Sequence, residues 1–347
     1  MDSYKYKEFD YSGIDKVLDG ILSDNKGFGD YVDEIINNGG ISYDGVYKSI
    51  ENVVSSQLND IKSLFANILL IMLIAAIFIN LSKTFGNRQV SENGFYVTYM
   101  ILFIILSVSF EQLGSVANSG ITGLVEFMKA LLPTFLMTVS YVAGEGSIVM
   151  YQSSLAVIAL VEVVLLKVFI PAINIYFLFS MINPLLEEDY FSKLLELIEK
   201  IISFGLKGIF ALVTGMSFVQ SIVIPATGNV HRGMLGKLVS NIPAAGAACE
   251  TIFQSVYGVG VIVKNSVGVA GLIVITGICA IPVVKIIIYT FTCHASAALS
   301  QPLAGDSRMI KCISSAALAS KLLLMVMVMA AMMFLFTIGI MVVATGK

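Results

Sequence analysis

Long apolar runs separated by short polar stretches make up most of the chain after residue 62. The clearest run covers 63–82, which is twenty residues without a charge between Lys62 and Lys83. A helix needs about twenty apolar residues to cross the hydrocarbon core of a bilayer. Further long apolar runs lie at 95–113, 121–142, 147–184, 203–224, 265–284, 286–304 and 322–346. These runs do not alternate with the period of two that barrel strands require, so the pattern predicts an all-α, polytopic membrane protein with about seven or eight membrane segments.

Two blocks leave the number of crossings open. The block 147–184 is too long for one straight span and contains Pro171, so it forms either one kinked helix or two short ones. The block 265–304 is interrupted by Lys285, where the chain either turns back as a hairpin or continues as one crossing.

The distribution of basic residues favours one of these arrangements, because Lys and Arg concentrate in cytoplasmic loops. A single crossing for 147–184 with a hairpin in 265–304 places eight basic residues inside and three outside. The eight are Lys83, Arg88, Arg232, Lys237, Lys264, Arg308, Lys311 and Lys321. Two crossings and no hairpin place seven inside and three outside. Both arrangements predict that the two termini lie outside the cytoplasm.

The first 62 residues have a different pattern. They carry 12 of the 24 acidic residues but only 6 of the 21 basic ones. Apolar side chains recur at helical spacing from Ile14 to Leu22, from Tyr31 to Ile36, and again after Tyr43. This pattern predicts an acidic extracytoplasmic helical segment over 1–62, which is either a small bundle, a set of membrane-surface helices, or a docking module for another subunit. The remainder, 63–347, is predicted to be the transmembrane domain.

Two stretches within the membrane domain, about 187–202 and 230–262, are amphipathic. Helices of this kind lie in the plane of the membrane interface, so both stretches are predicted to be interfacial helices.

Composition agrees with a membrane location. Hydrophobic residues make up 57% of the chain and charged residues 13%, and the mean hydropathy is +0.87. Soluble domains contain about 25% charged residues, so this composition excludes an ordinary soluble enzyme. The composition also excludes a disordered chain, which would require low hydrophobicity and high net charge. The net charge of −3 gives no basis for a nucleic-acid partner.

The chain lacks the residue patterns of catalytic and metal sites. Gly236-Lys237 resembles the end of a phosphate-binding loop, but the residues on either side do not fit that motif. The two histidines, His231 and His294, cannot supply a zinc-protease pair, and the four cysteines show no C-x-x-C spacing. The sequence therefore predicts that the protein is not an enzyme and has no cofactor and no metal site.

Charged and small residues within the apolar runs are the remaining candidates. A charged side chain at the bilayer centre costs at least about 2.5–3.5 kcal/mol, so Glu162, Lys167 and Lys207 indicate a polar pathway or a contact between subunits. The simpler and favoured explanation is internal pairing, such as Glu162 with Lys207, or extension of the side chains toward the interface. Small residues around Gly268 and Gly271 predict a helix that packs closely on a neighbour.

One stretch carries a recognisable motif. Residues 263–271 contain Lys264, Asn265, Gly268 and Gly271 in the spacing lysine-asparagine-x-valine-glycine-x-x-glycine. Accompanying segments are Asn241-Ile242-Pro243, Ile281-Pro282-Val283-Val284-Lys285, the run Ala297 to Leu303 with Gln301 and Pro302, Cys312, Ile14 to Leu18 and Phe28 to Val32. In this order the segments resemble the stage III sporulation protein AE family over most of the chain, most strongly over 236–345.

The resemblance implies a role in endospore formation. Members of that family are multi-pass proteins of the mother-cell membrane that surrounds the engulfed forespore. They belong to a secretion-like channel complex, AA to AH, which works with the AA ATPase and joins forespore protein Q through AH. The expected partners are therefore these proteins, the lipid bilayer and further copies of the chain. The candidate assembly residues from the family segments are Lys264, Asn265, Gly268, Gly271, Lys285, Gln301 and Pro302.

The alternative is a self-contained secondary transporter that uses Glu162, Lys167 and Lys207. Such a protein is expected to contain inverted internal repeats with unwound helices in equivalent positions. The sequence shows no convincing repeat of this kind.

Overall fold

A computed structural model gives the fold of the chain. It describes residues 10–19, 27–38, 51, 55, 62–77, 88–143, 146–186, 190–240, 246–302 and 306–344. Within these residues every regular element is helical and no strand occurs, which confirms the predicted all-α class. Most of the helix expected after Tyr43 lies outside the described residues.

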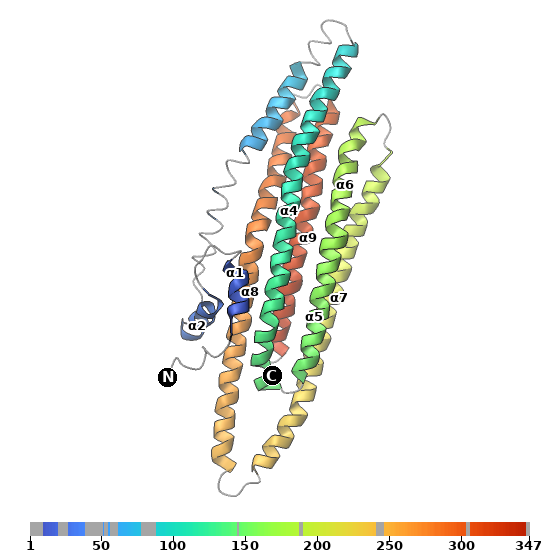
Figure 1. Ribbon diagram of the computed structural model, residues 1–347. Helices are drawn as coiled ribbons and strands as arrows, with labels where there is room; N and C mark the ends of the chain where they lie inside the picture. The colour runs from blue at the N-terminus through green and yellow to red at the C-terminus, as the bar shows by residue number, and fades with distance from the viewer. Residues whose placement is uncertain are drawn as a thin grey trace.

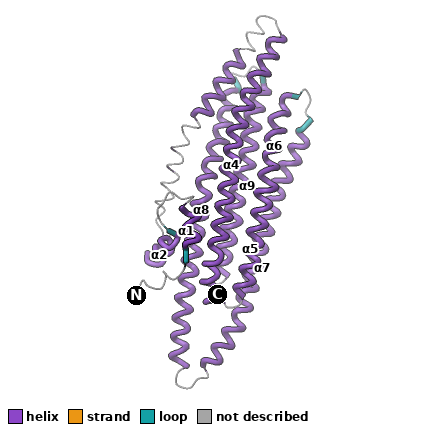
Figure 2. Tube along the Cα trace, in the orientation of Figure 1, coloured by secondary structure: helices purple, strands orange, loops and turns teal. Residues whose placement is uncertain are grey.

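The helices form an elongated bundle (Figures 1 and 2). The labelled helices are α1 (Ser12–Asp19), α2 (Phe28–Asn38), α4 (Arg88–Ala143), α5 (Gly146–Val164), α6 (Ile170–Ile182), α7 (Ser192–Ser240), α8 (Gly246–Ser300) and α9 (Ser307–Ala344). A π-helix, Leu165–Phe169, joins α5 to α6, and a 3-10 turn, Asn183–Leu185, follows α6. A further helix covers Lys62–Ile77. From α4 onward the chain runs up and down the bundle in alternating directions (Figure 1).

Within the part of the chain that the structure describes, five helical stretches are long and apolar enough to span a membrane. They are Glu92–Met137, Tyr151–Leu185, Ser192–Val219, Val261–Ser300 and Ser307–Val343, and the shorter apolar helix Lys62–Ile77 accompanies them. The first contains 46 residues, which is about 69 Å at 1.5 Å per residue. The hydrocarbon core of a bilayer is about 30 Å thick, so the apolar part of the bundle is roughly twice as long as one crossing requires.

The division of 88–143 into two spans is wrong. The expected spans 95–113 and 121–142 belong to one helix, α4, of 56 residues. Gly114 and Gly120 lie in the stretch between the expected spans, and each costs a helix only about 1 kcal/mol relative to alanine. The missing side chain at Gly120 also allows close contact, because a Cβ there would lie 2.9 Å from Pro282.

The hairpin at Lys285 is also wrong, because α8 continues through this position to Ser300. A lysine has good helix propensity and does not end a helix. Pro282 also lies inside α8 without breaking it. A proline removes one backbone donor, and its neighbours in a tightly packed bundle hold the helix together at that point.

The block 147–184 forms one continuous helical unit rather than two short crossings. The π-helix lies directly before Pro171, where the proline ring would clash with the carbonyl group of Lys167 in a regular α-helix. The wider π turn relieves that clash and allows α6 to continue.

The two amphipathic stretches join longer helices. The described part of 187–202 forms the first turns of α7, and the described parts of 230–262 form the end of α7 and the start of α8. Their placement at the membrane interface stays a prediction.

Glycines allow α8 to pack directly between α4 and α9. A Cβ atom at Gly268 would clash with Val342 of α9 and would lie 3.5 Å from Phe135 of α4. A Cβ at Gly271 would lie 2.9 Å from Leu131 of α4 and 3.4 Å from Ile338 of α9. The two glycines therefore fix the register of three helices at one level of the bundle.

We expect Gly268→Ala to lower the thermal stability of the detergent-solubilised protein. The added methyl group meets Val342, whose branched side chain has little rotamer freedom in a helix, and overpacking of this kind costs about 1–3 kcal/mol. The matched control is Gly339→Ala, because a Cβ at Gly339 meets nothing within 4 Å. Equal melting temperatures for the two variants would contradict the close packing of α8 on α9.

The N-terminal helices α1 and α2 pack against the bundle. Apolar residues of both helices, including Ile14 and Phe28, are buried in the same core cluster as the long helices. The ring of Phe28 lies 5.5 Å from that of Tyr11 and 6.2 Å from that of Phe127 in α4. The backbone N–H of Phe28 donates to the Asp15 carboxylate at 2.6 Å, which links the start of α2 to α1.

Local polar contacts stabilise the start of α1. The backbone N–H of Ser12 donates to the Asp10 carboxylate at 2.9 Å. Hydrogen bonds from Ser12 lower the pKa of Asp10, so this carboxylate stays ionised at neutral pH. Burial, together with the charge of Asp33, raises the pKa of Tyr11 to about 12, so the phenol stays neutral in the same range.

Phe28→Ala should detach α1 and α2 from the bundle. Removing a buried phenylalanine ring costs about 3–5 kcal/mol, and Phe28 connects both short helices to α4. Limited proteolysis of membranes that contain the variant should release the segment before residue 62 faster than in the wild type, while α4 to α9 stay intact. Unchanged cleavage would show that this contact does not hold the N-terminal helices.

Candidate functional site

One side of α4 carries polar residues along the middle of the helix. We call this set the polar stripe; its members are Glu111, Ser115, Asn118, Ser119, Thr122, Glu126 and Lys129. At 100° per residue they lie within about 120° of one another around the helix axis. All are exposed except Thr122, which is half-buried. From Glu111 to Lys129 the stripe is about 27 Å long, close to the thickness of the hydrocarbon core.

The same side of α4 is apolar before the stripe begins. Val97, Ile101, Ile104 and Val108 are exposed there, with 60%, 45%, 58% and 52% of their surface accessible. The outward face of a single helix therefore changes from apolar to polar at Glu111. This change is not explained by helix packing, because none of these side chains faces the core.

Contacts with α8 and α9 place the stripe beside uncharged segments. A Cβ at Gly120 would lie 2.9 Å from Pro282 and 3.0 Å from Met327. Slightly further along α4, Leu131 lies beside Gly271 and Ile338. The neighbouring segments 271–282 of α8 and 327–338 of α9 contain no charged residue. The part of the polar stripe that follows Gly120 therefore lies beside uncharged segments of α8 and α9.

An ion pair joins the polar stripe to α5. The Lys129 ammonium donates to Glu162 at 2.7 Å, with 45% and 35% of the two side chains accessible. Glu162 is therefore paired within the chain, but its partner is Lys129 of α4 and not Lys207. An unpaired charge facing lipid costs at least about 2.5–3.5 kcal/mol, so each partner lowers the cost of the other.

Two acidic members of the polar stripe have no such partner. Within the described part of the chain, neither Glu111 nor Glu126 forms an ion pair or a side-chain hydrogen bond. With Glu162 compensating Lys129, the stripe retains two uncompensated carboxylates. Its surface is therefore acidic as well as polar.

Lys285 lies in a small cavity beside the polar stripe. The cavity has a volume of about 280 Å³, and its lining includes Ser115 and Ser119 of α4 and Ile278, Pro282 and Lys285 of α8. Pro282 has no N–H to donate to the carbonyl group of Ile278, so this oxygen lacks its helical partner. The residues that line the cavity carry an ammonium group and two hydroxyl groups, and the cavity extends the polar surface from α4 toward α8.

Lys264 has a structural position at the end of α9. It is fully buried, and its ammonium group donates to the carbonyl oxygen of Val342 at 3.2 Å. The last carbonyl groups of a helix have no partner within the helix, and a basic side chain satisfies them well. The buried side-chain oxygen of neighbouring Asn265 has no hydrogen-bond partner among the described residues.

The other candidates lie apart from one another. Lys167 is exposed on the π-helix, and Lys207 is exposed on α7. Gln301 and Pro302 form an exposed turn directly after α8, where the N–H of Gln301 donates to the carbonyl oxygen of Ala298 at 3.3 Å. The structure thus brings Glu162 and Lys285 to either side of the polar stripe and groups Lys264 with Asn265, Gly268 and Gly271 elsewhere on α8.

The sequence pattern alone missed most of the polar stripe. Ser115, Asn118 and Ser119 lie in the expected connection between two spans. Polar residues are ordinary in such a connection, so they did not indicate a site. The usable signal was the helical spacing of Glu111, Thr122 and Lys129, which appears once α4 is treated as one continuous helix.

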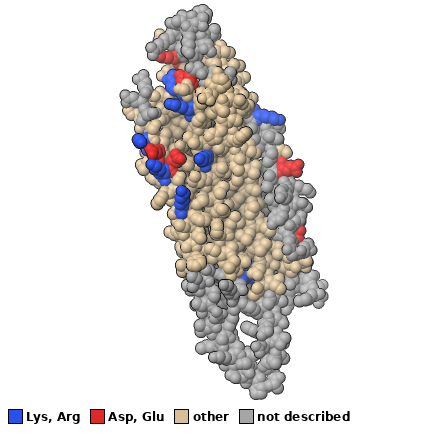
Figure 3. Space-filling view, turned by 180° about the vertical axis from the view of Figure 1, so that it is seen from behind, with Lys and Arg blue, Asp and Glu red and all other residues tan. Residues whose placement is uncertain are grey.

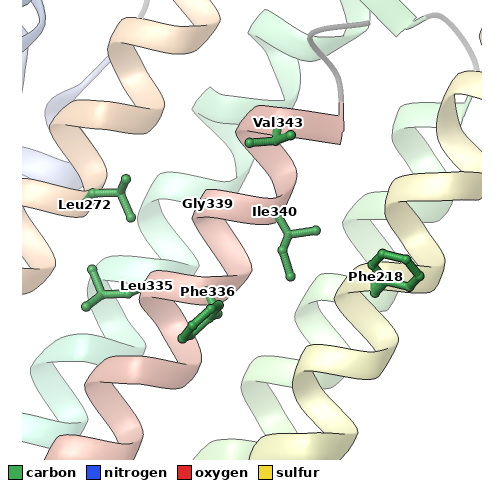
Figure 4. Close-up of a pocket in the computed structure, with 7 residues that line it drawn as sticks. All are labelled: Phe218, Leu272, Leu335, Phe336, Gly339, Ile340 and Val343. Atoms are coloured by element: carbon green, nitrogen blue, oxygen red, sulfur yellow. The ribbon is translucent and has the colours of Figure 1, made fainter.

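A larger cavity, of about 570 Å³, lies between α7 and the α8–α9 pair (Figure 4). Phe218 extends from α7 toward Phe336 and Ile340 of α9, while Leu272 comes from α8. Its side chains are all apolar and offer no donor or acceptor to orient a polar substrate. This lining suits hydrocarbon chains and supplies no catalytic chemistry.

On the face seen in Figure 3, many charged side chains of the described residues lie in the upper part. Figure 3 shows acidic and basic residues in the upper part of the rear face and a largely uncharged region below them. At the start of α7, Glu196 pairs with Lys193 at 3.2 Å and with Lys200 at 2.7 Å. These pairs are well exposed, and such pairs usually contribute no more than about 1 kcal/mol.

The described residues contain no group of three or more His, Cys, Asp or Glu side chains that could hold a metal ion. Cys279, Cys293 and Cys312 are free and buried within apolar surroundings. Buried thiols of this kind behave as small hydrophobic side chains.

Reversing the charge of either member of the Lys129–Glu162 pair should lower the amount of folded protein in the membrane. Glu162→Lys places two cations side by side, and Lys129→Glu places Glu126, Glu162 and the new carboxylate together. The double variant Lys129→Glu with Glu162→Lys should recover most of the loss, measured as monodisperse protein after extraction. Glu196→Gln, in an exposed network on α7, is the control and should have little effect. Failure of the double variant to recover would contradict a direct pairing.

The fold and this surface define a polytopic helical membrane protein in which helix α4 has a polar outward face. Comparison with known proteins gives the family: the model for stage III sporulation protein AE matches residues 27–345, and the chain belongs to this family. A curated relative, stage III sporulation protein AE of Bacillus subtilis (strain 168), is 23% identical over 244 residues. The aligned part covers 70% of this chain and 61% of the relative. No solved structure matches the chain.

Family membership connects the protein with sporulation. The multi-pass membrane character follows from the apolar helices, and together the two findings confirm the expectation of a sporulation-associated membrane protein.

Proposed function

We propose that the chain is a membrane subunit of the channel complex that connects the mother cell with the developing forespore. The match to the stage III sporulation protein AE family over 27–345 carries this proposal. In this role the protein lies in the mother-cell membrane around the forespore, with both termini on the extracytoplasmic side. It contributes no enzymatic step of its own.

The partners proposed for it are the other proteins of the stage III sporulation A complex. They include the AA ATPase and AH, and through AH the forespore protein Q. The bundle has features that suit a subunit of an assembly: its apolar helices hold it in the membrane, and α4 presents an acidic, polar face that no other described helix covers.

The arrangement of charges gives little support to a self-contained transporter. Glu162, Lys167 and Lys207 were the residues on which that alternative depended. Glu162 pairs with Lys129, while Lys167 and Lys207 point outward from separate helices. Transporter sites require groups that converge near the centre of the membrane, and these three do not.

In-frame deletion of the gene from its spore-forming host should block development after engulfment. Heat-resistant spores should be lost, and fluorescence microscopy should show engulfed forespores that stop developing. The wild-type gene supplied at another site should restore spores, and Gly339→Ala, which meets no neighbouring atom, should restore them equally well. A normal yield of heat-resistant spores from a clean deletion would refute the proposal.

Crosslinked co-purification from sporulating cells tests the proposed partners. A tagged, functional form of the chain should recover the AA ATPase and AH, and protein Q should appear when AH is present. A strain that lacks AH should lose Q from the purified material but retain the others. Recovery of the chain with none of these proteins would contradict its place in the complex.

A further inference from the structure

The polar stripe of α4 is on the outside of the bundle and lies within Glu92–Met137, a stretch long and apolar enough to span a membrane. On the other outward sides large apolar residues are exposed, for example Phe204 of α7 at 79% and Met332 of α9 at 43%. Those sides suit contact with lipid. The stripe, with Glu111 and Glu126 unpaired, does not suit contact with lipid.

A second observation indicates that water reaches the α4–α8 side of the bundle. Helix α1 packs on α4 and helix α2 packs on α8. Both are short and acidic, and together they contain Asp15, Asp19, Asp30, Asp33 and Glu34 but only one basic residue, Lys16. Charged helices of this kind require water beside them, so water reaches the bundle on this side and near one end of the polar stripe.

One copy of the chain does not enclose the stripe. No other described helix covers the polar side of α4, so a single bundle with the bilayer at this level would expose about 27 Å of polar surface to hydrocarbon. Several copies arranged with α4 inward would remove that contact and leave the apolar sides of α7 and α9 toward lipid.

We propose that copies of this chain assemble with the polar stripes of α4 around a common water-filled passage whose wall favours cations. This inference rests on the proposed channel role and adds to it the residues that face the passage. Glu111 and Glu126 give the wall two uncompensated carboxylates, against the ammonium group of Lys285 on its α8 side, and the Lys129–Glu162 pair contributes polar groups without net charge. Acidic α1 and α2 lie near one end of the stripe and add negative charge there.

Cysteine accessibility tests the passage. In a background with the four native cysteines replaced by alanine, single variants Ser115→Cys, Asn118→Cys and Thr122→Cys report on the stripe. Phe204→Cys and Met332→Cys report on the apolar sides. Membranes containing each full-length variant are treated with a membrane-impermeant methanethiosulfonate reagent, which modifies thiolates in water and does not modify thiols in hydrocarbon.

The stripe positions should react and the two apolar positions should not. A cationic reagent should modify the stripe positions about ten-fold faster than an anionic one, after each rate is divided by its rate with a free thiol in solution. Adding Glu126→Gln should reduce that ratio. If the cysteine-free background fails to produce spores, the same variants are measured in the wild-type chain, whose described cysteines are buried, after subtraction of its own labelling.

The labelling is measured twice, once in sporulating cells and once with the chain produced alone in a non-sporulating bacterium. Reaction of the stripe in both settings supports a passage formed by copies of this chain. Reaction only in sporulating cells overturns the assignment to copies of the chain and assigns the opposite wall to other subunits. Stripe positions as unreactive as Phe204→Cys would overturn the passage itself.

The deletion experiment keeps this inference separate from the proposed function. Loss of spores on deletion, combined with unreactive stripe positions, refutes the passage and leaves the role in the channel complex intact. Normal spores on deletion refute the role, whatever the labelling shows.

Discussion

The polar outward surface of the bundle depends on one feature: α4 runs without a break from Arg88 to Ala143. Polar residues spaced three and four apart share one side only while the helix continues, and a break between 113 and 121 would separate Glu111 from Lys129. Helix α8 supports that continuity, because Pro282 fits against the side of α4 that Gly120 leaves free. The close packing of α8 on α4 at Gly120 and the alignment of the polar stripe therefore both depend on the continuity of α4.

The stage III sporulation protein AE signature has a structural explanation on α8. Gly268 and Gly271 allow α8 to contact α4 and α9 directly, and Lys264 satisfies a carbonyl group in the last turn of α9. These residues thus stabilise the three-helix centre of the bundle. The polar surface on α4 is distinct from this centre, which separates residues that hold the fold from residues that face a partner or solvent.

Most of the fold was predictable from the sequence, because uncharged runs of twenty residues identify membrane helices reliably. The helical, polytopic class and the helices near Ile14 and Tyr31 were confirmed. The connections were harder to predict. Lys285, Gly114 and Gly120 look like interruptions in a hydropathy pattern, yet a lysine or a glycine costs a packed helix little, so α8 and α4 continue.

The site was predictable only in part, for the same reason. Glu162 was identified as an unusual intramembrane charge, but its partner was not. Lys129 reaches Glu162 because α4 and α5 lie side by side, and the spacing of residues along the chain does not reveal that neighbourhood. The polar stripe was divided between two expected spans and a connection. Its recognition required the continuous helix first and the exposure of its residues second.

The central claim is that α4 presents its polar side to water inside an assembly of the chain, within the membrane. Electron cryo-microscopy of the purified full-length protein in lipid nanodiscs tests it most directly. We expect particles with more than one copy, in which α4 faces a central space without lipid density while α7 and α9 contact the lipid. Single copies with lipid density against α4 between Glu111 and Lys129 would contradict it.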